Sequence, residues 1–513
     1  MKKDLPEDHG LSPRLLRTSL IRKSGNDQLL TDVQYAGLTQ GIGRGRSALV
    51  VAPTSSGKTD VGLYAAATWL ESGDIMSRKV AYLVSHRALA RQKYLEFRDP
   101  QMLGVFQLDR VQLVLATGDE VIDGNGEPNQ DPLDATFVVA TYEKFLAMLA
   151  GSGLRQDMSH YCVVADEIQL VADEGRGQDI EILLTLIRAA KCGQFVGLSA
   201  VLHKNDFVLL ADWLALEVVR VDGREVPLTL ELRTPDATHV TTFGSRDRID
   251  KTASNPAVDT FEILKQLARK PKDHFPVAVF CMTKPRVEDL ARAWARSLGA
   301  KETADLSAQL ELFDEASGLS NDLLVYVDNK FGVHTADLLE TERALVEDHL
   351  DQDKLSIVFA TTTLAQGLNY SFQTVVFDKW WRRNYARQAD EAIPKSEFHN
   401  MAGRAGRLGK SAGKTGRVIY SADARRARAA YQYLSADTEE VLDGRIDPTR
   451  FDQLALQIVS AGIVNTDENL LNFLGQTLSA HIAREKNRAV DAVWREKLEV
   501  SLKNLETWGF IRL

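Results

Sequence analysis

The sequence is poor in cysteine, in long hydrophobic runs and in net positive charge, and each shortage excludes a class of protein. Three cysteines, Cys162, Cys192 and Cys281, occur in 513 residues without a CxxC pair, so a zinc ribbon or an iron–sulfur cluster has no ligand set. No apolar run reaches the roughly 18 residues of a membrane helix, and the start, MKKDLPEDHG, lacks the apolar stretch of a signal peptide. We therefore expect a cytoplasmic protein with no membrane partner.

Acidic residues outnumber basic ones, with 71 Asp and Glu against 62 Lys and Arg and a net charge of −9. This balance excludes a protein that coats nucleic acid with a uniformly basic surface, but a local basic groove is compatible with it. Hydrophobic residues make up 44% of the chain and charged residues 26%, which is ordinary for globular domains. At about 150 residues per domain, the length predicts roughly three domains.

Two parts of the chain alternate short apolar runs with amphipathic stretches. SALVVA (47–52) and YCVVAD (161–166) belong to the first part, and PVAVFCM (276–282) and LLVYV (323–327) to the second. Buried strands separated by helices are typical of a parallel sheet that is covered on both faces. We predict an N-terminal extension at 1–30, a first α/β unit at 31–222, a connector and the start of the second unit at 223–275, the second unit at 276–435 and a helical module at 440–513.

The last part of the chain is predicted to be helical. Leu470, Leu474, Leu478 and Ile482 recur at every fourth position, as residues on one face of a helix do. Gly509 suits the position after a last helix, and the final residues, FIRL, begin like a strand. Helices that lead into such a strand indicate a winged-helix-like module.

The sharpest local pattern is APTSSGKT, at 52–59, directly after the apolar run SALVV. A strand, a loop of small residues and a helix place several backbone N–H groups around a polyphosphate. Lys58 is predicted to reach the β- and γ-phosphates of ATP, and the Thr59 hydroxyl to hold Mg²⁺. The predicted phosphate-binding residues are Thr54, Ser55, Ser56, Gly57, Lys58 and Thr59.

Two acids end another apolar run, VVADEIQ at 163–169. Such a pair is costly at the end of a buried strand unless a cation is present. In an ATP-hydrolysing P-loop protein, the first acid, Asp166, orients Mg²⁺, and the second, Glu167, activates the attacking water.

A third pattern, HNMAGRAGR at 399–407, lies in the second unit and places Arg404 and Arg407 three residues apart. Residues at this spacing share a helical face, so both guanidinium groups are predicted to neutralise the γ-phosphate as arginine fingers. Around this pattern, residues 379–417 carry ten Lys and Arg against three Asp and Glu, which is +7 in a chain of −9. Such a concentration is the charge pattern expected of a nucleic-acid groove.

Trp380 and Trp381 open this basic stretch, and three interpretations stay open for them. They stack on bases, they form the base of a strand-splitting hairpin, or they are ordinary core or interface residues.

In this order, the three patterns resemble superfamily 2 helicases of the DExH type, with DEIQ and MAGRAGR closest to the Ski-like branch of 3′–5′ translocases. Further segments extend the resemblance from residue 29 to residue 421: LLTDVQ (29–34), SHRALARQ (85–92), ATGD (116–119), ATYEK (140–144), LSAVL (198–202), VAVFCMTK (277–284) and ATTTLAQGLN (360–369). The resemblance implies an α/β fold of two tandem RecA-like domains, followed by a helical winged-helix-like C-terminal module.

The resemblance also implies roles at matching positions. Gln34 would read the adenine, and Gly367 and Asn369 would reach toward the nucleotide. The residues that would contact nucleic-acid phosphates are Arg87, Thr117, Gly118, Thr141 and Thr361. Hydroxyls and backbone amides bind phosphates without reading bases, as a motor that steps along any sequence requires.

The leading hypothesis is an ATP- and Mg²⁺-dependent translocase or helicase, acting 3′–5′ on single-stranded nucleic acid, with DNA favoured over RNA. Motif III reads Ser199, Ala200, Val201 where the family has a third-position Thr, and Asn400 stands where Gln is usual. The lost hydroxyl supports an alternative, a nucleic-acid-sensing ATPase switch that controls a protein partner without unwinding, with further parts on that partner or on a missing C-terminal domain. An RNA helicase is another alternative, and a P-loop kinase leaves the second α/β unit unexplained.

Overall fold

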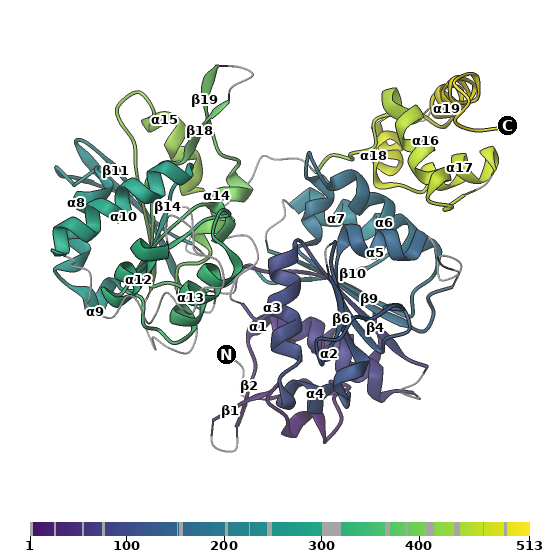
Figure 1. Cartoon of the computed structure of the whole chain (residues 1–513), viewed down its shortest axis with the longest axis horizontal. Coiled ribbons are helices and arrows are strands. Elements are labelled where there is room, and N and C mark those ends of the chain that lie inside the picture. Colours follow the sequence, from purple (N-terminus) through teal and green to yellow (C-terminus); the bar gives the residue numbers. More distant parts are fainter. Residues whose placement is uncertain are drawn as a thin grey trace. The chain divides into compact units, whose positions relative to one another are not determined.

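A computed structural model divides the chain into two compact units (Figure 1). The first contains residues 1–52, 56–221 and 441–513, and the second contains residues 53–55 and 222–440. The structure describes residues 4–24, 27–53, 56–73, 77–118, 120–150, 152, 157–200, 204–224, 226–243, 249–299, 320–364, 370–384, 388–406, 415–435, 442–464, 466–486 and 490–512.

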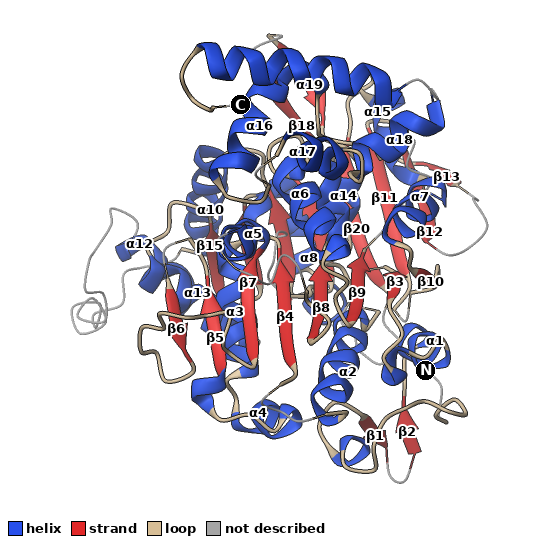
Figure 2. Cartoon of the chain, turned by 90° about the vertical axis from the view of Figure 1, so that its right-hand side faces the viewer, coloured by secondary structure: helices blue, strands red, loops and turns tan. Residues whose placement is uncertain are grey.

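The first unit is built on a sheet of eight strands in the order β10-β3-β9-β8-β4-β7-β5-β6, whose members lie side by side in Figure 2. Every neighbouring pair is parallel except β5 with β6. The strands are β3 (Ala48–Val51), β4 (Lys79–Val84), β5 (Leu113–Ala116), β6 (Val121–Asp123), β7 (Phe137–Thr141), β8 (Tyr161–Asp166), β9 (Gln194–Ser199) and β10 (Glu217–Arg220). A small antiparallel pair, β1 (Arg22–Ser24) and β2 (Asp27–Leu29), precedes the sheet.

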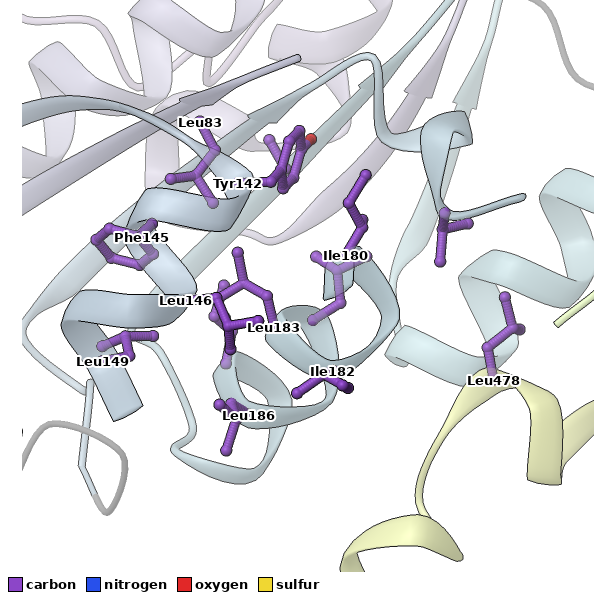
Figure 3. Packing of buried hydrophobic residues seen from close by; sticks show 14 of the residues in the cluster. Leu83, Tyr142, Phe145, Leu146, Leu149, Ile180, Ile182, Leu183, Leu186 and Leu478 are labelled. Carbon is purple, nitrogen blue, oxygen red and sulfur yellow. The ribbon is translucent and has the colours of Figure 1, made fainter. Parts of the chain in front are cut away.

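Both faces of this sheet are covered, because successive side chains of a strand point to opposite sides. In β3, Ala48 and Val50 belong to one apolar cluster, and Leu49 and Val51 belong to the other. Helices α1 (Asp32–Thr39), α2 (Lys58–Glu71), α3 (Arg87–Phe97) and α4 (Pro100–Phe106) cover the first face, and α5 (Tyr142–Ala150), α6 (Gly177–Ala189) and α7 (Lys204–Leu214) the second. Figure 3 shows the packing of α5 against α6 on the second face.

The second unit has its own sheet of eight strands, in the order β13-β12-β11-β20-β17-β14-β16-β15. The six strands from β11 to β15 in this order are parallel, and β12 and β13 are antiparallel additions. The strands are β11 (Leu228–Thr234), β12 (Ala237–Phe243), β13 (Asp250–Ala253), β14 (Val277–Phe280), β15 (Phe331–His334), β16 (Ile357–Ala360), β17 (Thr374–Phe377) and β20 (Gly416–Ser421). The helices of this unit are α8 (Thr260–Ala268), α9 (Pro271–His274), α10 (Lys284–Leu298), α12 (Ser320–Asp328), α13 (Glu340–Asp351), α14 (Lys395–Ala402) and α15 (Ala427–Ala430). Two parallel-rich sheets with covering helices confirm the predicted α/β class with tandem RecA-like domains.

Residues 223–275, predicted as a connector and the start of the second unit, contribute β11, β12 and β13 to the second sheet. One segment differs from its expected structure. The run LLVYV (323–327), predicted as a strand, lies in helix α12, so that prediction is wrong. The helix buries Leu323, Tyr326 and Val327, whose spacing of three and four residues also satisfies a helical face.

The three cysteines are free, and Cys162 and Cys281 are buried. Burial raises the pKa of both thiols, and it raises the pKa of Cys192 to about 12, so all three are unreactive side chains at neutral pH. In the described part of the chain, no cluster of three His, Cys, Asp or Glu side chains could hold a metal ion. No helix of that part is long and apolar enough to cross a membrane.

The C-terminal helices pack on the second face of the first sheet. They are α16 (Phe451–Ser460), α17 (Asp467–Leu474), α18 (Leu478–Lys486) and α19 (Val490–Thr507). Their apolar residues share one cluster with α5, α6 and α7, and Leu478 is visible at this contact in Figure 3. The Trp213 indole N–H also donates to the Gln476 carbonyl at 2.8 Å. These contacts account for the grouping of residues 441–513 with the first unit.

A buried carboxylate fastens this module to α6. Glu181 is fully buried and accepts from the Arg445 N–H at 2.9 Å, from the Ser479 N–H at 2.6 Å and from the Ser479 hydroxyl at 2.9 Å. Burial raises the pKa of Glu181, while these donors oppose the rise. Because a buried carboxylate needs such partners, Glu181 specifies where the module docks.

The module is helical, as predicted, but its details differ. The predicted continuous face of Leu470, Leu474, Leu478 and Ile482 is divided between α17 and α18, although all four side chains are buried. Gly509 follows α19 with a φ of 77°, and the Phe510 N–H donates to the Leu505 carbonyl at 2.9 Å, which is the C-terminal capping pattern expected of glycine. The strand expected for FIRL is not formed by the described residues 508–512.

We expect Glu181→Ala to loosen this docking, because two N–H groups and one hydroxyl lose their acceptor. The free energy of unfolding should fall by about 2–4 kcal/mol, and amide exchange should accelerate at Arg445 and Ser479. The measurements are a denaturant melt and hydrogen exchange by mass spectrometry. Glu499→Ala, at an exposed position of α19, is the control and should change neither. A Glu181→Ala protein with wild-type exchange at both amides would contradict the assignment.

Candidate functional site

The predicted site residues of the first unit gather at one edge of its sheet. Parallel strands end at a common edge. The phosphate-binding loop follows β3, motif III (199–201) begins at the end of β9, and motif II, the DEIQ segment that begins with Asp166, begins at the end of β8. The loops after the neighbouring strands β4, β7 and β5 carry Arg87, Thr141, Thr117 and Gly118. The edge therefore has a half with the nucleotide motifs and a half with the motifs predicted to bind the polymer.

In the phosphate-binding loop, β3 leads to Ala52, and α2 begins at Lys58. The Lys58 ammonium is buried and donates to the Ala52 carbonyl at 2.6 Å, so it lies at the start of its own loop. Gly57 has a φ of 91°, which an L side chain rarely adopts. The positive N-terminal end of α2 and the Lys58 charge thus converge where a polyphosphate is predicted to bind. Thr59 is the second residue of the helix and is half-buried.

Gln34 packs against this loop. A Cβ added at Gly57 would lie 2.8 Å from Gln34 Nε2, so only glycine leaves room for the amide. Gln34 accepts from the Thr31 N–H at 2.8 Å and donates to the Asp60 carboxylate at 2.5 Å. The amide of Gln34 is therefore engaged within the unit, and its role as the adenine-reading residue stays a prediction.

Asp166 and Glu167 follow β8 at the same edge. Burial, followed by the neighbouring Glu167 charge, raises the pKa of Asp166 to about 6, while Lys93 and Lys58 oppose the rise. Among the described residues, two groups donate hydrogen bonds to this carboxylate, the Glu167 N–H at 3.0 Å and the Tyr82 hydroxyl at 3.3 Å. A divalent cation beside Asp166 would remove the cost of its burial, so the donor set fits Mg²⁺ held by Asp166 and Thr59 with a nucleotide.

Glu167 has a left-handed backbone, with a φ of 55° and a ψ of 43°, which is uncommon for a residue with a side chain. Its carboxylate accepts from the Gln169 amide, and Gln169 in turn accepts from the Ser199 hydroxyl at 2.8 Å. Hydrogen bonds between side chains thereby join motif II to motif III, a connection that we did not predict. The DEIQ pattern is visible in the sequence, but no local pattern indicates the direction of the Gln169 side chain.

Lys93 is a second residue that sequence reasoning missed. It lies on α3 at 4% exposure and pairs with Glu96 at 2.7 Å. Its charge lowers the pKa of both Asp60 and Asp166, against the larger opposing effect of their burial. From the sequence, a lysine directly after SHRALARQ is expected to be a solvated helix residue. Only the packing of α3 places Lys93 near Asp60 and Asp166.

On the other half of the edge, Arg87 and Gly118 are exposed, and an added Cβ at Gly118 would meet Arg87 Nη2 at 2.8 Å. Thr117 and Thr141 are buried to 4% and 5% exposure. The Thr117 hydroxyl faces the Glu120 carbonyl at 3.4 Å, and the Thr141 hydroxyl accepts from the Lys144 N–H at 3.4 Å. This geometry favours backbone contacts to a polymer at both threonines, and the contacts themselves stay predictions.

Arg176 connects two segments of the polymer half, the half of the edge whose motifs are predicted to bind nucleic acid. Its guanidinium donates to Glu143 of the ATYEK segment at 2.7 Å and to the carbonyl of Ser85, which precedes Arg87 by two residues. Its N–H donates to Asp173 at 2.9 Å. The loop after motif II is thus fastened to two segments predicted to bind the polymer.

In the second unit, α14 carries the start of HNMAGRAGR. Phe398 anchors it by stacking between Phe377 and Tyr433, at centroid distances of 4.3 and 4.2 Å. Arg404 follows the helix and is half-buried, and its carbonyl accepts from the Phe372 N–H at 2.8 Å. Thr361 directly follows β16 and is 9% exposed. Five predicted site residues lie outside the described residues: Thr54, Ser55, Gly367, Asn369 and Arg407.

The basic stretch is partly neutralised by ion pairs. Arg382 pairs with Glu397 at 3.1 Å, and Arg383 pairs with Asp390 at 3.5 Å. Arg417 pairs with Glu231, which is buried in the second sheet. The count of +7 already includes Glu397 and Asp390, so among these pairs only Arg417 with Glu231 lowers the positive charge of the stretch further.

The two tryptophans of this stretch have different environments. Trp380 is buried and donates to the Ser421 carbonyl at 2.9 Å, so it is a core residue. Trp381 begins β18 (Trp381–Asn384), which pairs with β19 (Ala389–Ala392) as an antiparallel hairpin. The Arg426 guanidinium lies 4.4 Å from the Trp381 ring. A hairpin is thus present between ATTTLAQGLN (360–369), which is motif V of the family, and HNMAGRAGR (399–407), which is motif VI, with Trp381 at its base.

Comparison with known proteins agrees with this geometry. Residues 31–207 match the family model described as DEAD/DEAH box helicase. The chain is 29% identical over 396 residues to the ATP-dependent DNA helicase Hel308 of Pyrococcus horikoshii, covering 76% of this chain and 50% of that protein. It is 27% identical over 495 residues to Hel308 of Thermoplasma acidophilum, covering 95% of this chain and 66% of that protein.

The chain thus spans half to about two thirds of the length of these relatives. The comparisons confirm the resemblance to DEAD/DEAH helicases for the first α/β unit, and the narrower Ski-like branch stays a prediction.

We expect His399, on α14, to be neutral down to about pH 4, because burial lowers its pKa to about 4. An unfolded chain takes up this proton near pH 6.5. Acidification from pH 7 to pH 5 should therefore cost about 2 kcal/mol of unfolding free energy through this side chain alone. Urea melts at both pH values, for the wild type and for His399→Gln, measure the difference. Equal pH losses in the two proteins would contradict the lowered pKa.

Proposed function

We propose that this chain is an ATP-dependent nucleic-acid translocase or helicase that acts 3′–5′ on single-stranded DNA. The observation that carries the proposal is the division of one sheet edge into a nucleotide half and a polymer half on adjacent strands. ATP chemistry after β3, β9 and β8 can thus affect polymer contacts after β4, β7 and β5 through a single rigid sheet. The relatives' description as DNA helicases favours DNA over RNA.

Each residue of the nucleotide half has a role in hydrolysis. Glu167 accepts a proton from water as the water oxygen bonds to the γ-phosphorus and the bond to the β–γ bridging oxygen breaks. Lys58 and the N-terminus of α2 stabilise the phosphate charge, and Arg404 and Arg407 are the arginine fingers. Mg²⁺, held by Thr59 and Asp166 with the nucleotide, would neutralise charge on the β- and γ-phosphates.

The polymer half binds phosphates rather than bases. Arg87 supplies an exposed cation, and Thr117, Gly118 and Thr141 supply backbone groups at strand ends. In the second unit, Thr361 supplies such a group after β16. The Glu167–Gln169–Ser199 chain offers a route by which hydrolysis alters the loop after β9.

A second candidate is an ATPase switch that senses nucleic acid and controls a protein partner. The observation that favours it is Val201, which removes the third-position hydroxyl of motif III. Both candidates need polymer-stimulated ATP hydrolysis, and only the first needs strand displacement. A cytoplasmic location belongs to the same proposal.

The test is the steady-state ATPase rate without polymer, with single-stranded DNA and with single-stranded RNA. DNA should raise kcat at least about tenfold, and the stimulation should weaken with salt because phosphate contacts release counterions. Lys58→Ala should abolish turnover, and Glu167→Gln should lower kcat by about 10²–10⁴-fold while ATP still binds. Rates that no polymer changes would overturn the proposal, and a larger stimulation by RNA would reassign the substrate.

The β18–β19 hairpin should separate strands. Replacing residues 382–391 with a short Gly-Ser turn should leave DNA-stimulated ATPase within about threefold of wild type. Unwinding of a duplex with a 3′ single-stranded tail should fall at least about tenfold in the same protein. A fluorescence strand-displacement assay measures the loss, and the ATPase rate is the internal control. Undiminished unwinding would contradict the wedge role, and its absence in the wild type would favour the switch.

A further inference from the structure

Arg224 has no role in the proposed function so far, although this half-buried side chain of the second unit contacts the turn that carries Arg404. It lies in the segment that follows β10 and precedes β11. Its Nη2 group donates to the Gly403 carbonyl at 3.2 Å and to the Ala405 carbonyl at 3.0 Å. The two acceptors flank Arg404 on either side, so Arg224 holds both peptide groups that bracket that residue.

The backbone of this turn depends on Arg224. A helix leaves its last carbonyls without intrahelical donors, and buried carbonyls need partners. The other carbonyls of the turn are satisfied within the backbone: Met401 accepts from Arg404 at 3.1 Å, Ala402 from Ala405 at 3.0 Å and Arg404 from Phe372 at 2.8 Å. The side-chain donor to Gly403 and Ala405 is Arg224 alone among the hydrogen bonds of the described residues.

Neighbouring contacts fix the segment of Arg224 on the same turn. A Cβ added at Gly406, whose φ is 96°, would lie 2.8 Å from Val226 Cγ1. The Gly416 N–H donates to the Pro227 carbonyl at 2.8 Å. The residues that follow Arg224 therefore pack along the turn and along the start of β20.

The chemistry of Arg224 suits this place. Burial lowers its pKa to about 10, so the guanidinium stays charged at neutral pH. The carbonyl end of α14 carries partial negative charge, which a cation stabilises. A guanidinium holds two carbonyls with a planar donor set that the ammonium of lysine does not reproduce.

We propose that Arg224 is a positioning residue for the arginine fingers of motif VI. By holding the carbonyls of Gly403 and Ala405, it sets the direction in which Arg404 leaves the turn. It contacts neither phosphate nor water in the reaction. This inference rests on the proposed function, since it assumes that these arginines stabilise the γ-phosphate.

The test compares Arg224→Met, which keeps length without donors, with Arg224→Lys. In saturating single-stranded DNA, Arg224→Met should lower kcat by about 10- to 100-fold with the ATP KM within about threefold, because only transition-state contacts are lost. Arg224→Lys should recover part of the rate. The control is Arg233→Met, which removes a buried arginine of the same unit, bonded to Glu231, the Ala257 carbonyl and Gln266. It should lower Tm and spare the kcat of the folded protein.

Hydrogen exchange without nucleotide separates this inference from the proposed function. The amides of residues 403–406 should exchange faster in Arg224→Met than in the wild type, and Arg233→Met should not change them. If the wild type lacks polymer-stimulated ATPase, the proposed function fails, and accelerated exchange at 403–406 still supports the positioning contact. Wild-type exchange at these amides, a kcat within twofold of wild type in Arg224→Met, or an equal kcat loss in both methionine variants would overturn the positioning role.

Discussion

The structure depends on one geometric constraint, the common direction of the strands in each sheet. Parallel strands end at the same edge, and every loop that leaves that edge is close to its neighbours. In the first sheet, the order β3-β9-β8-β4-β7-β5 brings the phosphate-binding loop beside motifs II and III, and these beside the motifs predicted to bind the polymer. Segments up to about 150 residues apart in sequence thus form one continuous edge, which gives the proposed catalysis and polymer binding one rigid support.

Two charged side chains that are wholly or partly buried, Glu181 and Arg224, find their partners mainly in backbone groups. Glu181 accepts two N–H groups of the C-terminal module, and Arg224 donates to two carbonyls of the motif VI turn. Asp166 differs, because its carboxylate lies beside the charge of Glu167, which adds to the effect of burial in raising its pKa. The first two charges have their partners within the fold, whereas Asp166 is suited to a cation that arrives with the nucleotide.

Sequence reasoning succeeded where a local pattern suffices and failed where packing decides. The strand–loop–helix of residues 48–71 and the acids after β8 follow from apolar runs and loop composition. LLVYV is apolar at every position, so its sequence does not distinguish a buried strand from a buried helix, and the packing of α12 decided it. The regularly spaced Leu470, Leu474, Leu478 and Ile482 fit one helix equally well, yet the chain turns between α17 and α18.

The sequence by itself determined the α/β class, the tandem units and the positions of the motifs, because hydrophobic period and loop composition are local properties. Only the tertiary structure decided which side chains meet. It joined Glu167 to Ser199 through Gln169, buried Lys93 among the acids, and set Arg224 on the motif VI turn. Such contacts depend on strand order and side-chain direction, which a single sequence does not encode in any local pattern.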